Sequence, residues 1–151
     1  MTPAQLEILE ITAISWVGTP FCEHSQTKGA GVSCHLLLGA IYRESGLLPD
    51  LMDLPSAPTG WSRANTRSII AEWLDGPGLR WFRPVGTPHS EDGLEPGDVM
   101  LFKIGHAPHH VAMRLGEGRL ISTMETVGTR IAPNMTRAWI RRLVRSWRPI
   151  L

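Results

Sequence analysis

Cysteine is scarce in this sequence, with two residues among 151. A chain of this length with so few cysteines is not a disulfide-stabilised scaffold. Long apolar runs are also missing, since none approaches the roughly 18 residues that a membrane-spanning helix needs. Residues 1–10 lack the basic start and the apolar block of a signal peptide. We therefore expect a protein that is cytoplasmic as synthesised and that has no membrane partner.

Neither sign of charge is in excess. Fifteen basic and fourteen acidic residues leave a formal net charge of +1, so no overall field attracts nucleic acid. Apolar residues make up 42% of the chain and charged residues 19%, which is ordinary for a globular protein. We expect one folded domain over residues 1–151 that recognises its partner locally and binds no nucleic acid.

Cys34 follows a stretch of small and polar residues and precedes an apolar one. Residues 36–42 carry apolar side chains almost without interruption, as a buried helix does, so a helix is expected to begin at about Cys34. Backbone N–H groups and the positive end of the helix dipole favour a thiolate there and lower the pKa of the cysteine. The alternative is that Cys34 is only a small buried hydrophobic residue, as most free cysteines are.

Helices are expected first along the chain and strands afterwards. Apolar spacing and helix breakers predict helices over residues 3–17, 34–45 and 62–74. The apolar face of the first helix is expected to consist of Leu6, Leu9, Ile11, Ile14 and Val17. Short runs between turn residues predict strands at residues 79–85, 98–103, 110–115, 119–123, 129–132 and 142–147. This order is typical of an α+β fold with an antiparallel sheet.

A predicted hairpin brings a histidine and a serine near each other. Residues 116–118, Gly-Glu-Gly, form its turn, so His110 on the first strand and Ser122 on the second lie roughly opposite. An imidazole that is held by a polar neighbour and directed at a thiol activates a cysteine nucleophile. Two alternatives stay open for residues 106–110. They form a mobile loop without chemistry, or their three histidines bind zinc or nickel.

Four blocks of sequence, in this order and spacing, resemble the NlpC-type cell-wall cysteine peptidases. They are Trp16-Val17-Gly18-Thr19-Pro20-Phe21, Gly31-Val32-Ser33-Cys34, residues 94–102 and residues 110–121. Together they extend over nearly the whole chain. The Gly-Thr-Pro block and residues 28–31 look most like the branch encoded by tailed phages, prophages and gene-transfer particles. Membership of that branch implies phage-tail components as partners and explains the missing signal peptide.

The resemblance implies a papain-like α+β fold in which N-terminal helices pack on a small C-terminal antiparallel sheet. It also implies a cysteine endopeptidase that cleaves amide bonds in peptidoglycan stem peptides. Carried over by position, Cys34 is the nucleophile, His110 is the base and Ser122 is the third catalytic residue. Thr123 and Glu125 are nearby substitutes for Ser122. No metal ion and no organic cofactor is required.

Departures from the family pattern surround the cysteine. Ser33 stands in place of the usual aspartate, His35 in place of a serine, and Phe21 in place of a tyrosine. These three positions are expected to bind substrate, together with Trp61, which lies near a loop and suits the wall of a groove. Without a carboxylate at position 33, we expect little preference for a free amino terminus. Stem peptides that are still linked to the glycan should therefore be cleaved.

Three functions are open at this point. The first is hydrolysis of peptidoglycan amides. The second is a binding or tail-assembly protein that keeps the fold without useful catalysis, because a fold does not guarantee chemistry. The third is a thiol acyltransferase that uses the same cysteine and histidine on a lipid or a small amide. A phage-borne enzyme would be virion-associated or delivered to the periplasm and cell wall.

Overall fold

The computed structural model describes residues 1–51 and 53–151. The helices are α1 (Pro3–Trp16), α2 (Cys34–Glu44), α3 (Trp61–Ala64), α4 (Ile69–Leu74) and α5 (Arg137–Arg142), with 3₁₀ turns η1 (Pro77–Arg80) and η2 (Gly116–Gly118). The strands are β1 (Gln26–Thr27), β2 (Gly31–Val32), β3 (Phe82–Val85), β4 (Val99–Ile104), β5 (Ala107–Arg114), β6 (Leu120–Met124), β7 (Gly128–Ala132) and β8 (Leu143–Pro149). As predicted, helices α1 to α4 precede the main sheet, whereas α5 lies between β7 and β8.

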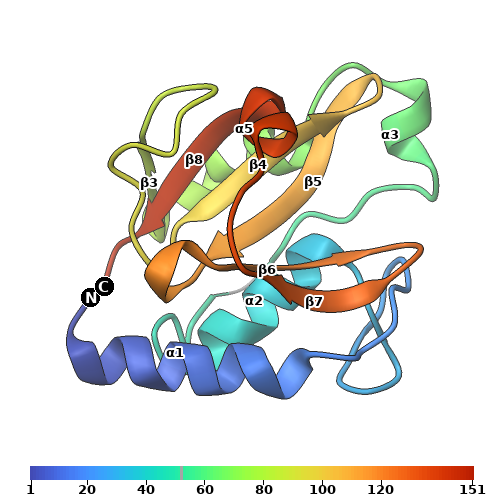
Figure 1. Ribbon diagram of the computed structural model, residues 1–151. Helices are drawn as coiled ribbons and strands as arrows, with labels where there is room; N and C mark the ends of the chain where they lie inside the picture. Colours follow the sequence, from blue (N-terminus) through green and yellow to red (C-terminus); the bar gives the residue numbers. More distant parts are fainter. Residues whose placement is uncertain (52) are drawn as a thin grey trace.

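The six strands from β3 onward form one antiparallel sheet in the order β3-β8-β4-β5-β6-β7. Helices α1 and α2 lie on one face of this sheet and α5 lies on the other (Figure 1). The larger core fills the α2 side and includes Val111 and Met113 of β5. The smaller core lies beneath α5 and includes Phe102 of β4 and Ala112 of β5. Side chains of β5 therefore alternate between the two cores.

Helix α1 buries a different face from the predicted one. Leu9, Ala13 and Trp16 are buried, whereas Ile11 and Ile14 are 62% and 54% exposed. Apolar residues occur all around this helix, so their spacing does not define its rotation. Long-range polar contacts help to fix the rotation of α1. Glu10 Oε1 accepts hydrogen bonds from the Gly116 N–H and from Arg119, each at 2.8 Å, and the Trp16 indole donates to Glu44.

The helix predicted over residues 62–74 is two helices. Ser68 has extended backbone geometry, and its hydroxyl accepts a hydrogen bond from the Ala71 N–H at 3.1 Å. A serine that caps in this way starts a new helix, which separates α3 from α4. Both short helices then contribute side chains to one cavity, Trp61 from α3 and Ile69 from α4 among them.

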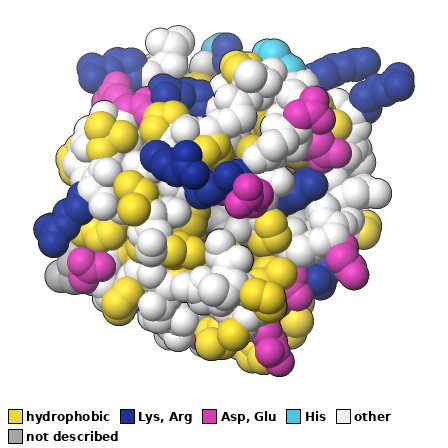
Figure 2. All heavy atoms as spheres, turned by 90° about the vertical axis from the view of Figure 1, so that its left-hand side faces the viewer, with side chains coloured by type: hydrophobic (Ala, Val, Ile, Leu, Met, Phe, Trp, Pro, Cys, Tyr) yellow, Lys and Arg dark blue, Asp and Glu magenta, His cyan; other side chains and the backbone are white. Residues whose placement is uncertain are grey.

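The surface carries charges of both signs. Figure 2 views the end of the molecule at which the two termini lie, and it shows acidic and basic side chains interspersed with hydrophobic ones. This distribution agrees with the small net charge of +1. In the part of the chain that the structure describes, no helix has the length and hydrophobicity needed to cross a bilayer.

Candidate active site

Helix α2 begins at Cys34, as the sequence predicts. Ser33 is the N-cap residue with extended backbone geometry, but its hydroxyl makes no capping hydrogen bond. The Cys34 side chain is buried, and its Sγ donates a hydrogen bond to the backbone carbonyl of His109 at 3.5 Å. The N–H groups of Val111, His35 and Cys34 itself also face the sulfur. The thiol thus lies between the first turn of α2 and strand β5.

Burial changes the expected ionisation of this thiol. The pKa of Cys34 is raised above its ordinary value because desolvation disfavours the thiolate, and the N–H groups of Val111 and His35 lower it by less. The sequence-based expectation of a lowered pKa is therefore wrong. That expectation assumed that the start of helix α2 is open to water. In the structure, strand β5 covers the start of α2. The resting sulfur is a protonated thiol.

His110 lies next to a β-bulge. Phe102 of β4 pairs with His110, and Lys103 pairs with Pro108, so His109 is an extra residue on β5. Bulges of this kind redirect side chains and occur next to active sites. The His110 ring packs against Phe102 and Trp139, with ring centroids 6.0 and 5.5 Å away. The imidazole therefore belongs mainly to the α5 side of the sheet.

The surroundings of His110 keep its ring neutral. The residue is 6% exposed. Burial, and secondarily the neighbouring His109, lower the pKa of His110 from 6.5 to about 4. A neutral imidazole can accept a proton at neutral pH, so the site combines a neutral thiol with a neutral base. Among the described residues, no hydrogen bond joins His110 to Cys34, whose thiol instead donates to the His109 carbonyl.

The pocket is lined by residues of β5 and β6, the start of α2, and helices α3 and α4. Strands β5 and β6 pair only at Met113–Ile121 and Arg114–Leu120, and they diverge toward His110 (Figure 1). The pocket there has a volume of about 640 Å³. The expected catalytic and substrate-binding residues that line it are Phe21, Ser33, Cys34, His35, Trp61 and His110, and Thr123 and Glu125, the two substitutes for Ser122, line it as well. Residues from both faces of the sheet reach one cavity because the ladder is interrupted.

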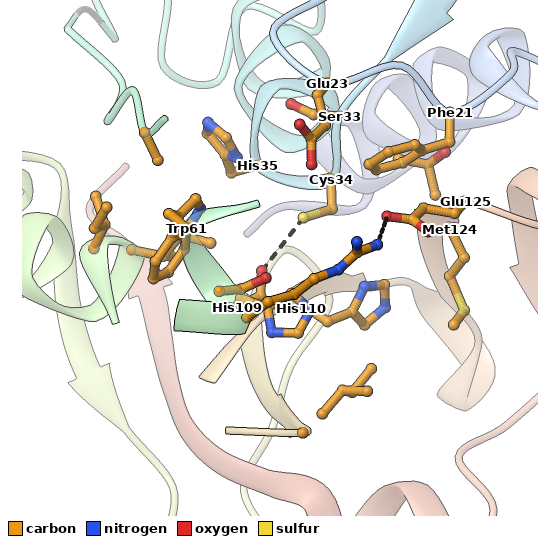
Figure 3. Close-up of a pocket in the computed structure, with 18 of the residues that line it drawn as sticks. Phe21, Glu23, Ser33, Cys34, His35, Trp61, His109, His110, Met124 and Glu125 are labelled. Carbon is orange, nitrogen blue, oxygen red and sulfur yellow. Dashed lines mark hydrogen bonds and ion pairs between the residues drawn. The ribbon is translucent and has the colours of Figure 1, made fainter. Parts of the chain in front are cut away.

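Figure 3 shows how the pocket residues are arranged. Ser33 and Cys34 lie on one side together with Glu23, and the histidines of β5 lie across from them. Trp61 stands at one end of the pocket and Phe21 at the other, near Glu125. A peptide lying between these ends would pass the Cys34 sulfur. The arrangement suits attack by sulfur on a carbonyl group of an extended chain.

Ser122 is not among the residues that line the pocket. It pairs with Arg130 in the β6–β7 ladder, and it shares a face of β6 with Leu120, which belongs to the core beneath α5. That is the face on which the His110 ring packs. The β5–β6 pairing ends at Met113–Ile121, so Ser122 has no partner on β5 that would set its distance from His110. Its role in orienting His110 stays a prediction.

Arg63 is among the pocket residues that did not stand out from the sequence as site residues. Glu23 lines the pocket beside Ser33, and Arg63 forms an ion pair with Glu125 at 3.8 Å, both residues being pocket-lining. The order of elements along the chain does not predict that the segments carrying Arg63 and Glu125 meet. Within residues 1–51 and 53–151, no three histidine, cysteine or acidic side chains converge as a metal site.

The NlpC/P60 family matches residues 23–148. The chain belongs to the NlpC/P60 family. No curated protein matches it. The matched residues include both Cys34 and His110, so the family assignment covers the entire candidate site.

Solved structures resemble this NlpC/P60 domain in fold. An NlpC/P60 family protein of Bacillus cereus has a TM-score of 0.59 at 22% identity, over 97% of this chain and 40% of its own. The NlpC/p60 domain of the peptidoglycan hydrolase SagA has a TM-score of 0.55 at 15% identity, over 93% and 95%. RipD of Mycobacterium tuberculosis has a TM-score of 0.56 at 13% identity, over 100% of both chains.

These likenesses confirm the predicted α+β, papain-like fold. The NlpC/P60 chain described here spans less than half the length of the Bacillus cereus protein. RipD is described as a non-catalytic NlpC/p60 domain protein adapted to peptidoglycan binding. The family therefore includes a hydrolase and a non-catalytic binding protein, and membership alone does not assign catalysis.

Proposed function

We propose that the protein is a cysteine endopeptidase that cleaves amide bonds in the stem peptides of peptidoglycan. The observation that carries this proposal is the shared pocket, in which the Cys34 thiol at the start of α2 and the neutral imidazole of His110 border one cavity. A nucleophile and a base at one cavity suit acyl transfer. Peptidoglycan is proposed because SagA, a relative in fold, is a peptidoglycan hydrolase.

The proposed reaction starts from a neutral pair. His110 accepts the Sγ proton while the sulfur forms a bond to the carbonyl carbon of the amide, and the π electrons of the carbonyl move onto its oxygen. The imidazolium then donates its proton to the leaving amine as the C–N bond breaks. Water hydrolyses the resulting thioester and restores the thiol. The contact between His110 and Cys34 forms when substrate binds, because catalytic contacts often tighten in the complex.

The experiment is digestion of purified sacculi by the full chain, with the soluble products identified by mass spectrometry. Release of peptides by the wild-type protein and by Cys22→Ala, but not by Cys34→Ala, is the expected result. Cys22 is the matched control because it is the other free cysteine and is exposed. If all three proteins release nothing, the protein is not a peptidoglycan hydrolase. Acyl transfer to an added amine without hydrolysis would instead identify a thiol acyltransferase.

A binding function is the second candidate. Two observations favour it: the raised pKa of the buried Cys34 thiol, and the absence of a hydrogen bond between Cys34 and His110 among the described residues. RipD provides a precedent in fold, since it is described as non-catalytic and adapted to peptidoglycan binding. Co-sedimentation of the wild-type protein with sacculi, without release of peptides, would support this candidate over the enzyme.

We also propose that the substrate is a stem peptide still attached to the glycan, within the wall-opening step of a tailed phage or gene-transfer particle. The support is the likeness of the Gly-Thr-Pro block to that branch and the lack of a carboxylate at Ser33. The protein would then be virion-associated or delivered to the cell wall. Detection of the protein by immunoblot in purified particles tests this location, and its absence from them would contradict it.

A further inference from the structure

Two buried threonines on neighbouring strands have hydroxyl groups without hydrogen-bond partners. Thr123 of β6 and Thr129 of β7 pair directly across the ladder. Their exposed fractions are 0% and 1%. In the part of the chain that the structure describes, neither Oγ1 atom has a partner. A buried hydroxyl without a partner costs free energy, so each one calls for an explanation.

The two threonines differ in their relation to the pocket. Thr123 lines the pocket that contains Cys34, and Thr129 does not. Thr123 lies two residues after Ile121, which belongs to the core on the α2 side, so its side chain is on that face too. Ser122 is on the opposite face. The unpartnered hydroxyl of Thr123 therefore lies on the same side of the sheet as the Cys34 thiol.

Thr123 and the reacting sulfur of Cys34 border the same pocket. Thr123 lies two residues beyond Ile121, past the last β5–β6 pair, where β6 borders the pocket that also contains the Cys34 sulfur. No hydrogen bond joins Thr123 to that sulfur among the described residues, since Sγ donates to the His109 carbonyl. A carbonyl oxygen attached to the carbon that Sγ attacks would enter this region. The threonine hydroxyl is a donor that can rotate to meet it.

We propose that the Thr123 hydroxyl donates a hydrogen bond to the carbonyl oxygen of the scissile amide as that oxygen becomes an oxyanion. This inference rests on the proposed hydrolase function. When the S–C bond forms, the π electron pair of the carbonyl moves onto oxygen and the Sγ proton goes to His110. A preorganised donor in a water-excluded site stabilises that charge strongly. Phe21, which also lines the pocket, has no hydroxyl for this task.

The test compares Thr123→Val with Thr129→Val in the full chain. Each change replaces a buried, unpartnered hydroxyl by a methyl group of similar size, so both variants should fold with unchanged or higher melting temperature. On released stem peptides, Thr123→Val should lower kcat by about 100-fold with little change in KM, the usual effect of removing one oxyanion donor. Thr129→Val should keep the wild-type kcat, and Thr123→Ser should recover most of it.

Alkylation of Cys34 separates a role at the substrate oxygen from a role at the thiol. Iodoacetamide forms no oxyanion, so its rate with Cys34 should be the same in Thr123→Val and wild type. An unchanged kcat in Thr123→Val overturns the inference while the hydrolase function stands. An equal loss of kcat in Thr123→Val and Thr129→Val also overturns the inference, and so does slower alkylation of Cys34 in Thr123→Val. If the wild-type protein itself hydrolyses nothing, the proposed function fails first and the inference fails with it.

Discussion

Acidification should weaken the fold through one buried histidine, His110. In the folded protein its pKa is lowered to about 4, while the unfolded chain retains the ordinary value of 6.5. Between these two values the unfolded chain binds a proton and the folded protein does not. Folding stability therefore rises with pH across this window, and it is lost as the pH falls from 6.5 toward 4.

The two pKa values of His110 give the size of this effect. A pKa of 6.5 in the unfolded chain and about 4 in the folded protein correspond to about 3 kcal/mol in the limit, since each pKa unit is worth about 1.4 kcal/mol. Between pH 7 and pH 5, where the protein should remain folded, the loss is about 2 kcal/mol. The pKa of His35 is also lowered by burial, so the wild-type dependence includes more than His110.

Urea denaturation of wild type and His110→Gln at both pH values isolates the contribution of His110. Glutamine keeps a polar side chain of similar length but does not titrate. The difference in unfolding free energy between pH 7 and pH 5 should be smaller in His110→Gln by about 2 kcal/mol. His106→Gln is the matched control, because His106 lies exposed in the same segment, and it should keep the wild-type dependence.

The same variants report on catalysis. His110→Gln should lower turnover by several orders of magnitude because the base is lost, whereas His106→Gln and His109→Ala should change it little. If His110→Gln lost as much unfolding free energy between pH 7 and pH 5 as wild type does, the claim that this ring is buried and neutral would be refuted. Inactivation by His109→Ala would instead show that the bulge residue supplies the base.

Three further predictions concern the thiol, the third residue and the substrate. Because burial raises the pKa of Cys34, iodoacetamide should label exposed Cys22 first at neutral pH, and peptide mapping that finds Cys34 labelled first at pH 6 would contradict this. Ser122→Ala should lower turnover by about tenfold through loss of one neutral hydrogen bond, and an unchanged rate would remove Ser122 from the mechanism. Sacculi should be cleaved at least as fast as the same stem peptides released by an amidase, since Ser33 offers no carboxylate to an ammonium group. A preference for the released peptides that disappears in Glu23→Gln would make Glu23 the receptor.

The local features of the fold were predictable from the sequence. Helix α2 begins at Cys34 because a polar loop gives way there to an apolar run, and it stops before Gly46, which has φ of +71°. The strands from β4 onward lie within a few residues of their predicted ranges, because turn residues separate short β-forming runs. Alternation and turns are properties of neighbouring residues, so a single sequence contains them.

The properties that decide the chemistry depended on tertiary packing. Helix α1 is apolar all around, so only contacts with distant residues such as Gly116 decide which face is buried. The pKa of Cys34 rises because β5, far along the chain, covers the helix terminus. The bulge at His109 and the end of the β5–β6 pairing lie at the pocket, which Thr123 also lines. Burial and desolvation arise between residues that are remote in sequence, and local patterns therefore do not contain them.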